Sequence, residues 1–311
     1  MDFIKGFTFG WMSGKGTFLK EESKRSLSLM KKRTNSTYVI LALAALQDTA
    51  QSTYIDFVGD HMPSDEELIE WIAYAQSLGL HVIMKPTVNV KDGTWRAHIN
   101  FFDLDVPCEP KWGDWFTSYT AYQLHYAKLA EQTGCVMHIA GCEMVQTERR
   151  EQEWRRLIDE IRKVYSGAVT YNTDKYQEGN VKWWDAVDVI SSSGYYPIHD
   201  WDNQLDRIET IIEPFQKPFF FAEAGCPART GSSLVPNDWS HEGEINVDEQ
   251  ADFYRAMFAA CEKRPWVKGF GLWDWRTILY SEIDALQEDG YDVFGKPAEK
   301  VIADYYKRKE E

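Results

Sequence analysis

Eight short apolar runs recur along the chain, and longer segments with helical periodicity or helix-capping residues alternate with them. A parallel strand that is covered on both faces is nearly all hydrophobic and lacks polar alternation. Strands of this kind that alternate with helices are typical of α/β proteins with a parallel sheet. The expected strands are 3–9, 38–44, 81–86, 136–143, 168–172, 187–191, 219–223 and 267–273.

Eight such repeats favour a sheet that closes on itself. We therefore predict the α/β class and a single (β/α)8 TIM barrel, with residues 1–311 forming one catalytic domain; this length suits such a barrel. An open, doubly wound sheet is the alternative, but it calls for a glycine-rich dinucleotide turn after the first strand, which this chain lacks. The expected helices are 20–34, 64–77, 112–132, 147–165, 204–215, 247–264 and a closing helix after Pro297.

Charge and composition narrow the classes of partner. The formal net charge of −15 argues against a nucleic-acid partner, which would require a basic patch. No apolar run approaches the ~18 residues of a membrane span, and residues 1–6 lack the features of a secretory signal. The five cysteines are an odd number without a Cys-x-x-Cys pair, a pattern that favours reduced thiols. We expect a cytoplasmic protein, and the oligomeric state stays open.

Two glutamates stand where apolar strands end. Glu143 closes the run 136–143, and Glu223 follows Phe219-Phe220-Phe221-Ala222. In barrels of alternating strands and helices the carboxyl ends of the strands carry the chemistry. Two carboxylates at one rim are the requirement for hydrolysis of a glycosidic bond, in which one protonates the leaving oxygen and the other attacks the anomeric carbon or activates water.

The two carboxyl groups need different surroundings, because the donor must keep its proton while the nucleophile must stay ionised. Glu143 follows Gly141-Cys142, an apolar setting that favours a protonated carboxyl. Glu223 lies near Arg229 in sequence, and we expect Arg229 and the hydroxyl of Tyr195 or Tyr196 to hold it ionised.

Several stretches around these residues resemble glycoside hydrolase family 113, the endo-β-1,4-mannanases, within the clan of retaining (β/α)8 glycosidases. They are spread over most of the chain. The stretches are Lys85-Pro86, Gly93-Thr94-Trp95-Arg96, Trp115-Phe116 through Tyr119 to His125-Tyr126-Ala127, Gly141-Cys142-Glu143-Met144, Gly194-Tyr195-Tyr196-Pro197, Phe221-Ala222-Glu223-Ala224-Gly225 and Gly271-Leu272-Trp273-Asp274-Trp275.

The resemblance implies a retaining hydrolase of β-1,4-mannosidic bonds in mannan or manno-oligosaccharides. Glu143 would be the acid/base and Glu223 the nucleophile, with a glycosyl-enzyme intermediate between two displacements. Tyr195 or Tyr196 would steady the nucleophile, and Trp273 would form the floor beneath the attacked sugar. The wider clan usually places Asn before the acid/base to bind the sugar 2-hydroxyl, but Cys142 stands here. The residue that binds this hydroxyl is therefore left open.

Other polar and aromatic residues near the strand ends are candidates for binding the β-linked oligosaccharide. Lys85 ends the third strand and either bonds a sugar hydroxyl or forms an ion pair, and Asp274 stands between two tryptophans. Trp201 and Trp239 stack on sugars or cap the barrel. The predicted substrate-binding residues are Lys85, Trp95, Asn172, Tyr195, Tyr196, Trp273 and Asp274.

Three rival functions remain at this stage. The first is a retaining glycosidase of the same clan that acts on another β-linked oligosaccharide, such as a β-glucan. The second is a metal-dependent barrel hydrolase or isomerase, which would need clusters of His and Asp at strand ends. No His-x-His appears, and His138 is expected to be a core residue, so we expect neither a metal nor a cofactor. The third is a sugar-binding barrel without catalysis. The choice between endo and exo attack stays open.

Overall fold

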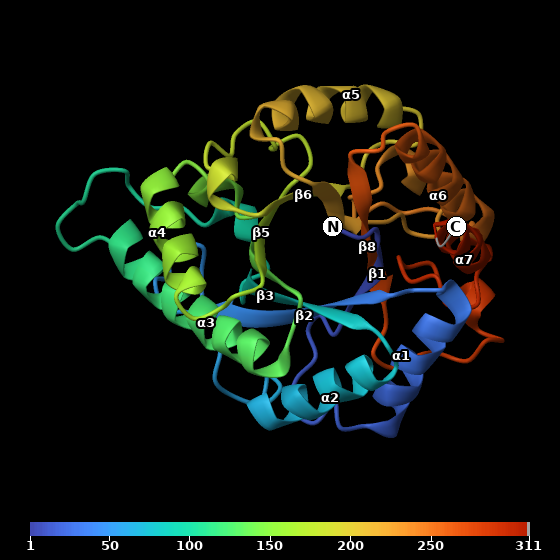
Figure 1. The fold of residues 1–311 in the computed structure, drawn as a ribbon, viewed down its shortest axis with the longest axis horizontal. Helices are drawn as coiled ribbons and strands as arrows, with labels where there is room; N and C mark the ends of the chain where they lie inside the picture. Colours follow the sequence, from blue (N-terminus) through green and yellow to red (C-terminus); the bar gives the residue numbers. More distant parts are fainter. Residues whose placement is uncertain (310–311) are drawn as a thin grey trace.

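The computed structural model describes residues 1–309, and these form a closed barrel of eight parallel strands in the order β1 to β8. Figure 1 looks along the barrel and shows the helices as a ring outside the strands. The strands are β1 (Ile4–Phe9), β2 (Tyr38–Gln47), β3 (His81–Val90), β4 (Met137–Cys142), β5 (Ala168–Thr173), β6 (Val189–Gly194), β7 (Phe219–Ala224) and β8 (Val267–Trp275).

Seven α-helices connect or follow the strands. They are α1 (Glu21–Thr34), α2 (Asp65–Ser77), α3 (Trp112–Thr133), α4 (Glu151–Arg162), α5 (Trp201–Ile212), α6 (Val247–Glu262) and α7 (Pro297–Arg308). The predicted (β/α)8 TIM barrel is therefore confirmed, and the open doubly wound sheet is excluded because β1 pairs with β8.

Local sequence signals account for several helix ends. Ser64 caps α2 by accepting a hydrogen bond from the Glu67 amide, and the Glu67 carboxylate accepts one from the Ser64 amide. This reciprocal arrangement satisfies two backbone donors that a helix leaves free. Asn246 caps α6 through its side-chain oxygen, which accepts a hydrogen bond from the Glu249 amide. Gly134 ends α3 in the left-handed conformation, which costs glycine little.

Some predicted boundaries were wrong. β2 and β3 run to Gln47 and Val90, beyond the expected ends at 44 and 86, because their last residues still pair with each other over ten positions. β6 begins at Val189 instead of 187. Helix α4 begins at Glu151 rather than 147, after a separate turn of 3-10 helix at Val145–Thr147.

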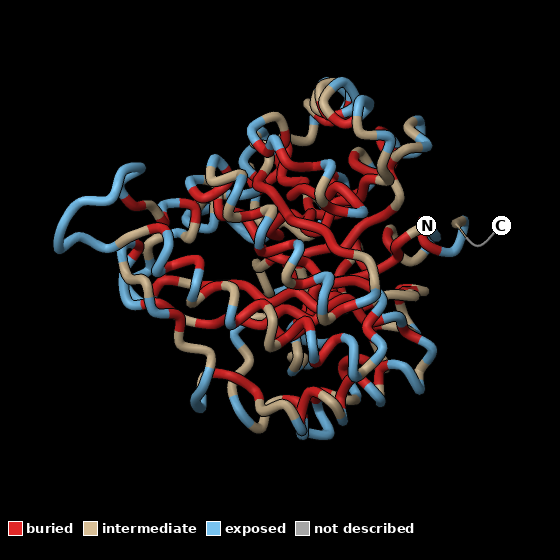
Figure 2. Tube along the Cα trace, turned by 60° about the vertical axis from the view of Figure 1, so that its left-hand side comes forward, coloured by how far each residue is buried: buried red, intermediate tan, exposed pale blue. Residues whose placement is uncertain are grey.

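The apolar core has two main parts, which Figure 2 shows as the buried centre of the molecule, and a small third cluster contains Tyr195, Trp273 and Tyr291. The larger part lies between the strands and the helices and contains most of the aromatic residues. The smaller part fills the inside of the barrel with the side chains of Ile4, Ile40, Ile83, Met137, Ile139, Val189, Phe220 and Ala222. These residues fill the lower interior of the barrel, and barrels of this type carry their sites at the strands' carboxyl ends.

Strands β4, β7 and β8 each carry an extra residue relative to a neighbouring strand, and those in β4 and β7 precede the two glutamates. Between β4 and β5, Ile139 pairs with Thr170, and the next pair is Cys142 with Asn172. Three steps along β4 thus match two along β5. Between β6 and β7, Ser192 pairs with Phe221 and Ser193 with Glu223, so β7 advances by two residues while β6 advances by one. Such bulges reverse the side to which the following side chains point.

Among residues 1–309, no helix combines the length and the apolar character that a bilayer crossing requires.

Candidate active site

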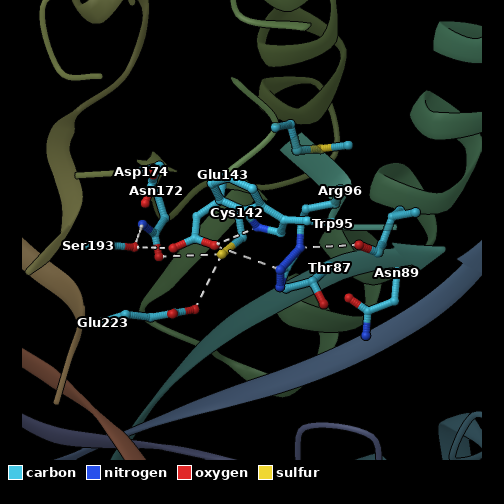
Figure 3. Close-up of polar contacts among 12 residues, drawn as sticks. Thr87, Asn89, Trp95, Arg96, Cys142, Glu143, Asn172, Asp174, Ser193 and Glu223 are labelled. Carbon is cyan, nitrogen blue, oxygen red and sulfur yellow. Dashed lines mark hydrogen bonds and ion pairs between the residues drawn. The ribbon is translucent and has the colours of Figure 1, made fainter. Parts of the chain in front are cut away.

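A cavity of about 870 Å³ opens at the carboxyl ends of the strands, and both Glu143 and Glu223 line it. Figure 3 shows their side chains directed into the same space from β4 and β7. The polar and charged residues that also line it are Asn89, Lys91, Thr94, Arg96, Asp174, Lys175, Gln177 and Asn237, and the aromatic ones are Trp11, Trp95, Tyr176, Tyr195, Trp239 and Trp273.

The carboxylate of Glu223 is buried and has three polar neighbours. Lys85 Nζ donates to Oε1 at 2.5 Å, and the Tyr195 hydroxyl donates to Oε2 at 2.9 Å. The Cys142 thiol lies 3.3 Å from Oε1. The bulge in β7 matters here, because strict alternation after the inward-facing Phe220 and Ala222 would turn Glu223 away from the barrel interior.

These neighbours keep Glu223 ionised. Burial raises the pKa of its carboxyl, but the charges of Lys85 and Arg96 and the hydrogen bonds from Lys85 and Tyr195 outweigh burial, and the pKa of Glu223 is lowered. Lys85 is fully buried, yet the neighbouring acidic groups outweigh the effect of burial and raise the pKa of its ammonium group. Burial raises the pKa of the Cys142 thiol well above its ordinary value, so this thiol is neutral. The ion pair is therefore Lys85 with Glu223.

Glu143 follows β4 directly and adopts a backbone φ of 53°, a left-handed conformation that side chains other than Asn and Asp rarely adopt. Its Oε1 accepts a hydrogen bond from the Ser193 hydroxyl at 2.7 Å. Its Oε2 accepts one from Trp95 Nε1 at 3.3 Å and lies 3.9 Å from Arg96 Nη1. The Glu143 amide donates to the Asn172 carbonyl at 2.8 Å, which fixes the turn.

A continuous chain of hydrogen bonds connects the two glutamates beneath the cavity. Asn172 Oδ1 accepts from Lys85 Nζ at 2.8 Å, and Asn172 Nδ2 lies 3.1 Å from the Ser193 hydroxyl. Lys85 donates to Glu223 at one end, and Ser193 donates to Glu143 at the other. Both carboxylates are thus held by buried groups from β3, β5 and β6, which leaves their remaining faces for a ligand.

Asp174 brings a third carboxyl group to the cavity. It follows β5, it is buried, and its nearest cation is Lys175 at 3.8 Å. Burial and then the nearby charge of Glu143 raise the pKa of Asp174 to about 8. A proton on Asp174 near neutral pH relieves the repulsion between two acids in one cavity.

The structure brings together some of the residues that we expected to bind substrate. Trp95, Tyr195 and Trp273 line the cavity. Lys85 and Asn172 do not, because both are fully buried below it and contact Glu223 and each other. Of the two roles open to Lys85, the ion pair is confirmed. Asn172 lies beneath the cavity and not in its lining, and its predicted contact with the substrate stays a prediction.

Three further expectations need correction. The Tyr196 hydroxyl donates to Glu178 at 2.5 Å, so this ring faces outward and not toward Glu223. Arg229 pairs with Asp289 at 2.9 Å, and Lys85 with Arg96 supplies the positive charge at Glu223 instead. Trp201 is buried at the start of α5 and cannot stack on a sugar. Each error concerns the direction of a side chain that sequence proximity does not fix.

Asp274 lies next to the cavity but does not line it. It lines an adjoining cavity of about 210 Å³ on the other side of Trp273. Burial and then the charge of Asp292 raise the pKa of Asp274 to about 7.

Arg96 and Ser193 are site residues that sequence reasoning missed. Ser193 belongs to Ser191-Ser192-Ser193, an unusual polar run at the end of an otherwise buried strand, and this polarity was the available signal. Arg96 belongs to a stretch noted for its resemblance, but its largely buried position beside Glu143 requires the fold of the loop after β3.

Across the part of the chain that the structure describes, no group of three or more His, Cys, Asp or Glu residues is arranged to hold a metal ion. His138 Nε2 donates a hydrogen bond to Gln123 Oε1 at 2.9 Å, and burial lowers the pKa of His138 to about 3. It is a neutral core residue, as its position within an apolar run predicted.

Comparison with known proteins gives a consistent result. The model of glycoside hydrolase family 113 matches residues 7–296. A solved GH113 β-1,4-mannanase is similar at 66% identity and a TM-score of 0.98, over 99% of each chain. The GH113 β-mannanase AaManA from Alicyclobacillus acidocaldarius, in complex with ManMIm, is similar at 41% identity and a TM-score of 0.96, over 99% of this chain and 98% of that one.

A more distant similarity concerns the fold alone. The β-glucuronidase of Ruminococcus gnavus shares 14% identity with a TM-score of 0.66, over 98% of this chain and 50% of that one. No curated protein matches the chain significantly by sequence.

Proposed function

The chain belongs to glycoside hydrolase family 113, and on that premise we propose that it is a retaining β-1,4-mannanase in which Glu223 is the nucleophile and Glu143 the acid/base. It is a glycoside hydrolase, and mannan or manno-oligosaccharides are its substrates. The observation that carries the assignment of roles is the buried Lys85–Glu223 ion pair, because it keeps one of the two carboxylates ionised.

In the first displacement, a Glu223 oxygen attacks the anomeric carbon while Glu143 gives its proton to the leaving glycosidic oxygen. The bond between the anomeric carbon and that oxygen breaks, and an ester to Glu223 forms. The Tyr195 hydroxyl and the Lys85 ammonium orient Glu223 for this attack. They also accept part of its negative charge when the ester breaks down in the second displacement.

In the second displacement, Glu143 removes a proton from water, and the resulting hydroxide attacks the same carbon and releases Glu223. The hydrogen bonds from Ser193 and Trp95 hold the Glu143 carboxylate in place for both steps. Two inversions give a product of retained configuration. A retaining mechanism requires the carboxyl groups to be about 5–5.5 Å apart.

Replacement of each glutamate tests the roles. Glu143→Ala and Glu223→Ala are each expected to lower turnover of mannohexaose by at least about 1,000-fold, and Glu242→Ala, at an exposed loop position, should match wild type. Near wild-type turnover by either catalytic variant would refute its role. The anomer formed first, followed by NMR, should be the β form; an α product would refute retention.

The sugar preference needs a separate measurement. A panel of β-1,4-linked manno- and gluco-oligosaccharides of equal length should show faster hydrolysis of the mannosides. Equal or greater kcat/KM on the glucosides would assign the enzyme to another substrate within the same clan.

We also propose that the enzyme acts in a reducing compartment such as the cytoplasm, because all five cysteines are free. Cell fractionation with activity assays tests this directly. Recovery of the activity outside the cell would contradict it.

A further inference from the structure

The second cavity, behind Trp273, contains a carboxyl group without a partner. Asp274 is half-buried, and its side chain makes no hydrogen bond or ion pair with any residue in the range 1–309. The other charged groups that line this cavity are engaged. Arg229 pairs with Asp289, and Arg276 pairs with both Asp292 and Glu288. Asp274 is therefore the group in this cavity that is free to accept a hydrogen bond from a ligand.

Aromatic rings form the walls around this carboxyl. Trp273 separates the two cavities, and Trp11 and Trp239 line both of them. Trp239 lies with its ring centre 4.7 Å from that of Tyr291, and it is 59% exposed. An exposed tryptophan beside a carboxyl group offers an apolar face together with a strong hydrogen-bond acceptor. Sugar rings present the complementary surfaces, namely apolar C–H faces and hydroxyl donors.

The position of the cavity relates it to the reaction. It adjoins the catalytic cavity and shares Trp11, Trp239 and Trp273 with it. A sugar above Trp273 would therefore have its next covalent neighbour within reach of Asp274. The volume of about 210 Å³ is well below the ~300–1,000 Å³ of pockets for larger organic ligands, so it suits one ring and not a chain.

We propose that this cavity is an accessory subsite for one further hexose unit of the bound oligosaccharide, with Asp274 accepting hydrogen bonds from its hydroxyl groups and Trp239 covering its face. This proposal rests on the proposed function. The hexose comes either from the main chain or from a branch attached to the sugar above Trp273. Both sources offer the same hydroxyl chemistry.

Kinetics on substrates of graded size test the subsite with Asp274→Asn. This variant keeps the shape of the side chain and replaces an acceptor oxygen with an amide. We expect kcat/KM to fall at least tenfold, through KM, for substrates whose extra hexose fills the cavity, and less than threefold for mannotriose. Asp105→Asn, at an exposed position in a surface loop, serves as the control and should follow wild type on every substrate.

Two series of substrates separate the sources. If the hexose belongs to the main chain, the loss should appear as linear substrates lengthen from mannotriose to mannohexaose. If it belongs to a branch, kcat/KM of Asp274→Asn should fall by the same small factor on every linear substrate. The tenfold fall should then appear on mannopentaose with a single α-galactosyl group on a hydroxymethyl oxygen. An equal effect on all substrates, or no effect on any, would overturn the subsite.

A second variant controls for a folding defect that Asp274→Asn could cause in β8. Trp239→Ala lies on an exposed loop and should reproduce the same dependence on substrate size. A uniform loss in Trp239→Ala would count against the subsite. If wild type fails to hydrolyse any β-1,4-mannoside, the proposed function is overturned and the subsite with it.

Discussion

Lys85 reaches Glu223 from the middle of β3, and the two residues are 138 positions apart in sequence. A buried ion pair often contributes little net stability, because each charge loses its hydration. Its retention here is understandable under the proposed mechanism, since burial alone would favour protonation of Glu223, the proposed nucleophile. Tyr195 adds a hydrogen bond but no positive charge.

Replacement of Lys85 by methionine should move the acidic limb of the pH profile. Lys85 lowers the pKa of Glu223 against the opposing effect of burial, so the loss of Lys85 raises the pKa of Glu223. Because Glu223 must be ionised, activity at low pH should disappear at a higher pH than in wild type. We expect kcat/KM at the optimum to fall about 100-fold.

The pH dependence of kcat/KM on mannohexaose measures this shift. Tyr195→Phe is the matched control, because it removes one hydrogen bond and leaves the cation in place. Its acidic limb should move in the same direction by a smaller amount. An unchanged limb in Lys85→Met would show that Lys85 does not control the ionisation of Glu223.

The backbone at Glu143 provides a prediction about stability. A left-handed φ of 53° costs residues other than glycine roughly 1–2 kcal/mol. Glu143→Gly and Glu143→Ala both remove the carboxyl group, so their difference isolates the backbone cost. We expect the glycine variant to be more stable than the alanine variant by about 1 kcal/mol in urea unfolding. Equal stabilities would mean that this conformation carries no cost.

Sequence could identify both glutamates because each follows an apolar strand directly, and strand burial is a local property. Sequence could not find Lys85 at Glu223 or turn Tyr196 away from it. These contacts depend on which residues of different strands lie at the same height along the barrel axis. That height is set by the register between the strands and by their bulges. Adjacent tyrosines on a loop point in different directions, and composition does not distinguish them.

At the scale of elements, the segment after β5 forms one wall of the cavity with Lys175, Tyr176 and Gln177. It is anchored by Glu178, whose side chain is fully buried. Ser192 and Tyr196 donate to Glu178 Oε1, and Arg207 of α5 donates to Oε2 at 2.8 Å. Sequence predicted the strand and the helix but not this anchor, because the partners come from three different elements.

Loss of Arg207 should loosen this wall. Arg207→Met leaves a fully buried carboxylate without its cation, and the cost is about 2 kcal/mol after allowance for the partial exposure of Arg207. Urea unfolding should show this loss, and KM for mannohexaose should rise. Arg156→Met, at an exposed position on α4, should change stability by less than about 0.5 kcal/mol. If Arg207→Met is as stable as wild type, the hydrogen bonds from Ser192 and Tyr196 are enough to hold Glu178 in place.

For the molecule as a whole, two buried carboxyl groups and one half-buried carboxyl group hold protons at unusually high pH. The pKa of Glu148 is raised to about 8, mainly by burial, that of Asp174 to about 8, and that of Asp274 to about 7. The unfolded chain would ionise all three near their ordinary values. Between the pKa of each group in the unfolded chain and its pKa in the folded protein, the folded state binds more protons than the unfolded state. The free energy of unfolding therefore falls as pH rises through this range. His138 acts oppositely below pH 6.5, because only the unfolded state protonates it there.

The melting temperature should therefore be higher at pH 5.5 than at pH 8. Each raised carboxyl contributes a slope of up to about 1.4 kcal/mol per pH unit, and three of them outweigh the single opposing histidine. Calorimetry across this range measures the trend. Glu148→Gln removes one of the three groups and should flatten the slope by about a third. A wild-type melting temperature that rises from pH 5.5 to pH 8 would refute this account.

The barrel's overall architecture was predictable because it rests on repetition, with eight apolar runs and the helices between them. The extra residues in β4 and β7 interrupt that repetition near the carboxyl ends of the strands. Because of the one in β7, Ala222 and Glu223 both face the inside of the barrel although they are neighbours in sequence. One strand can therefore fill the hydrophobic interior with one residue and present a charged group to the cavity with the very next, so the barrel gives up no packing layer to make room for the acid.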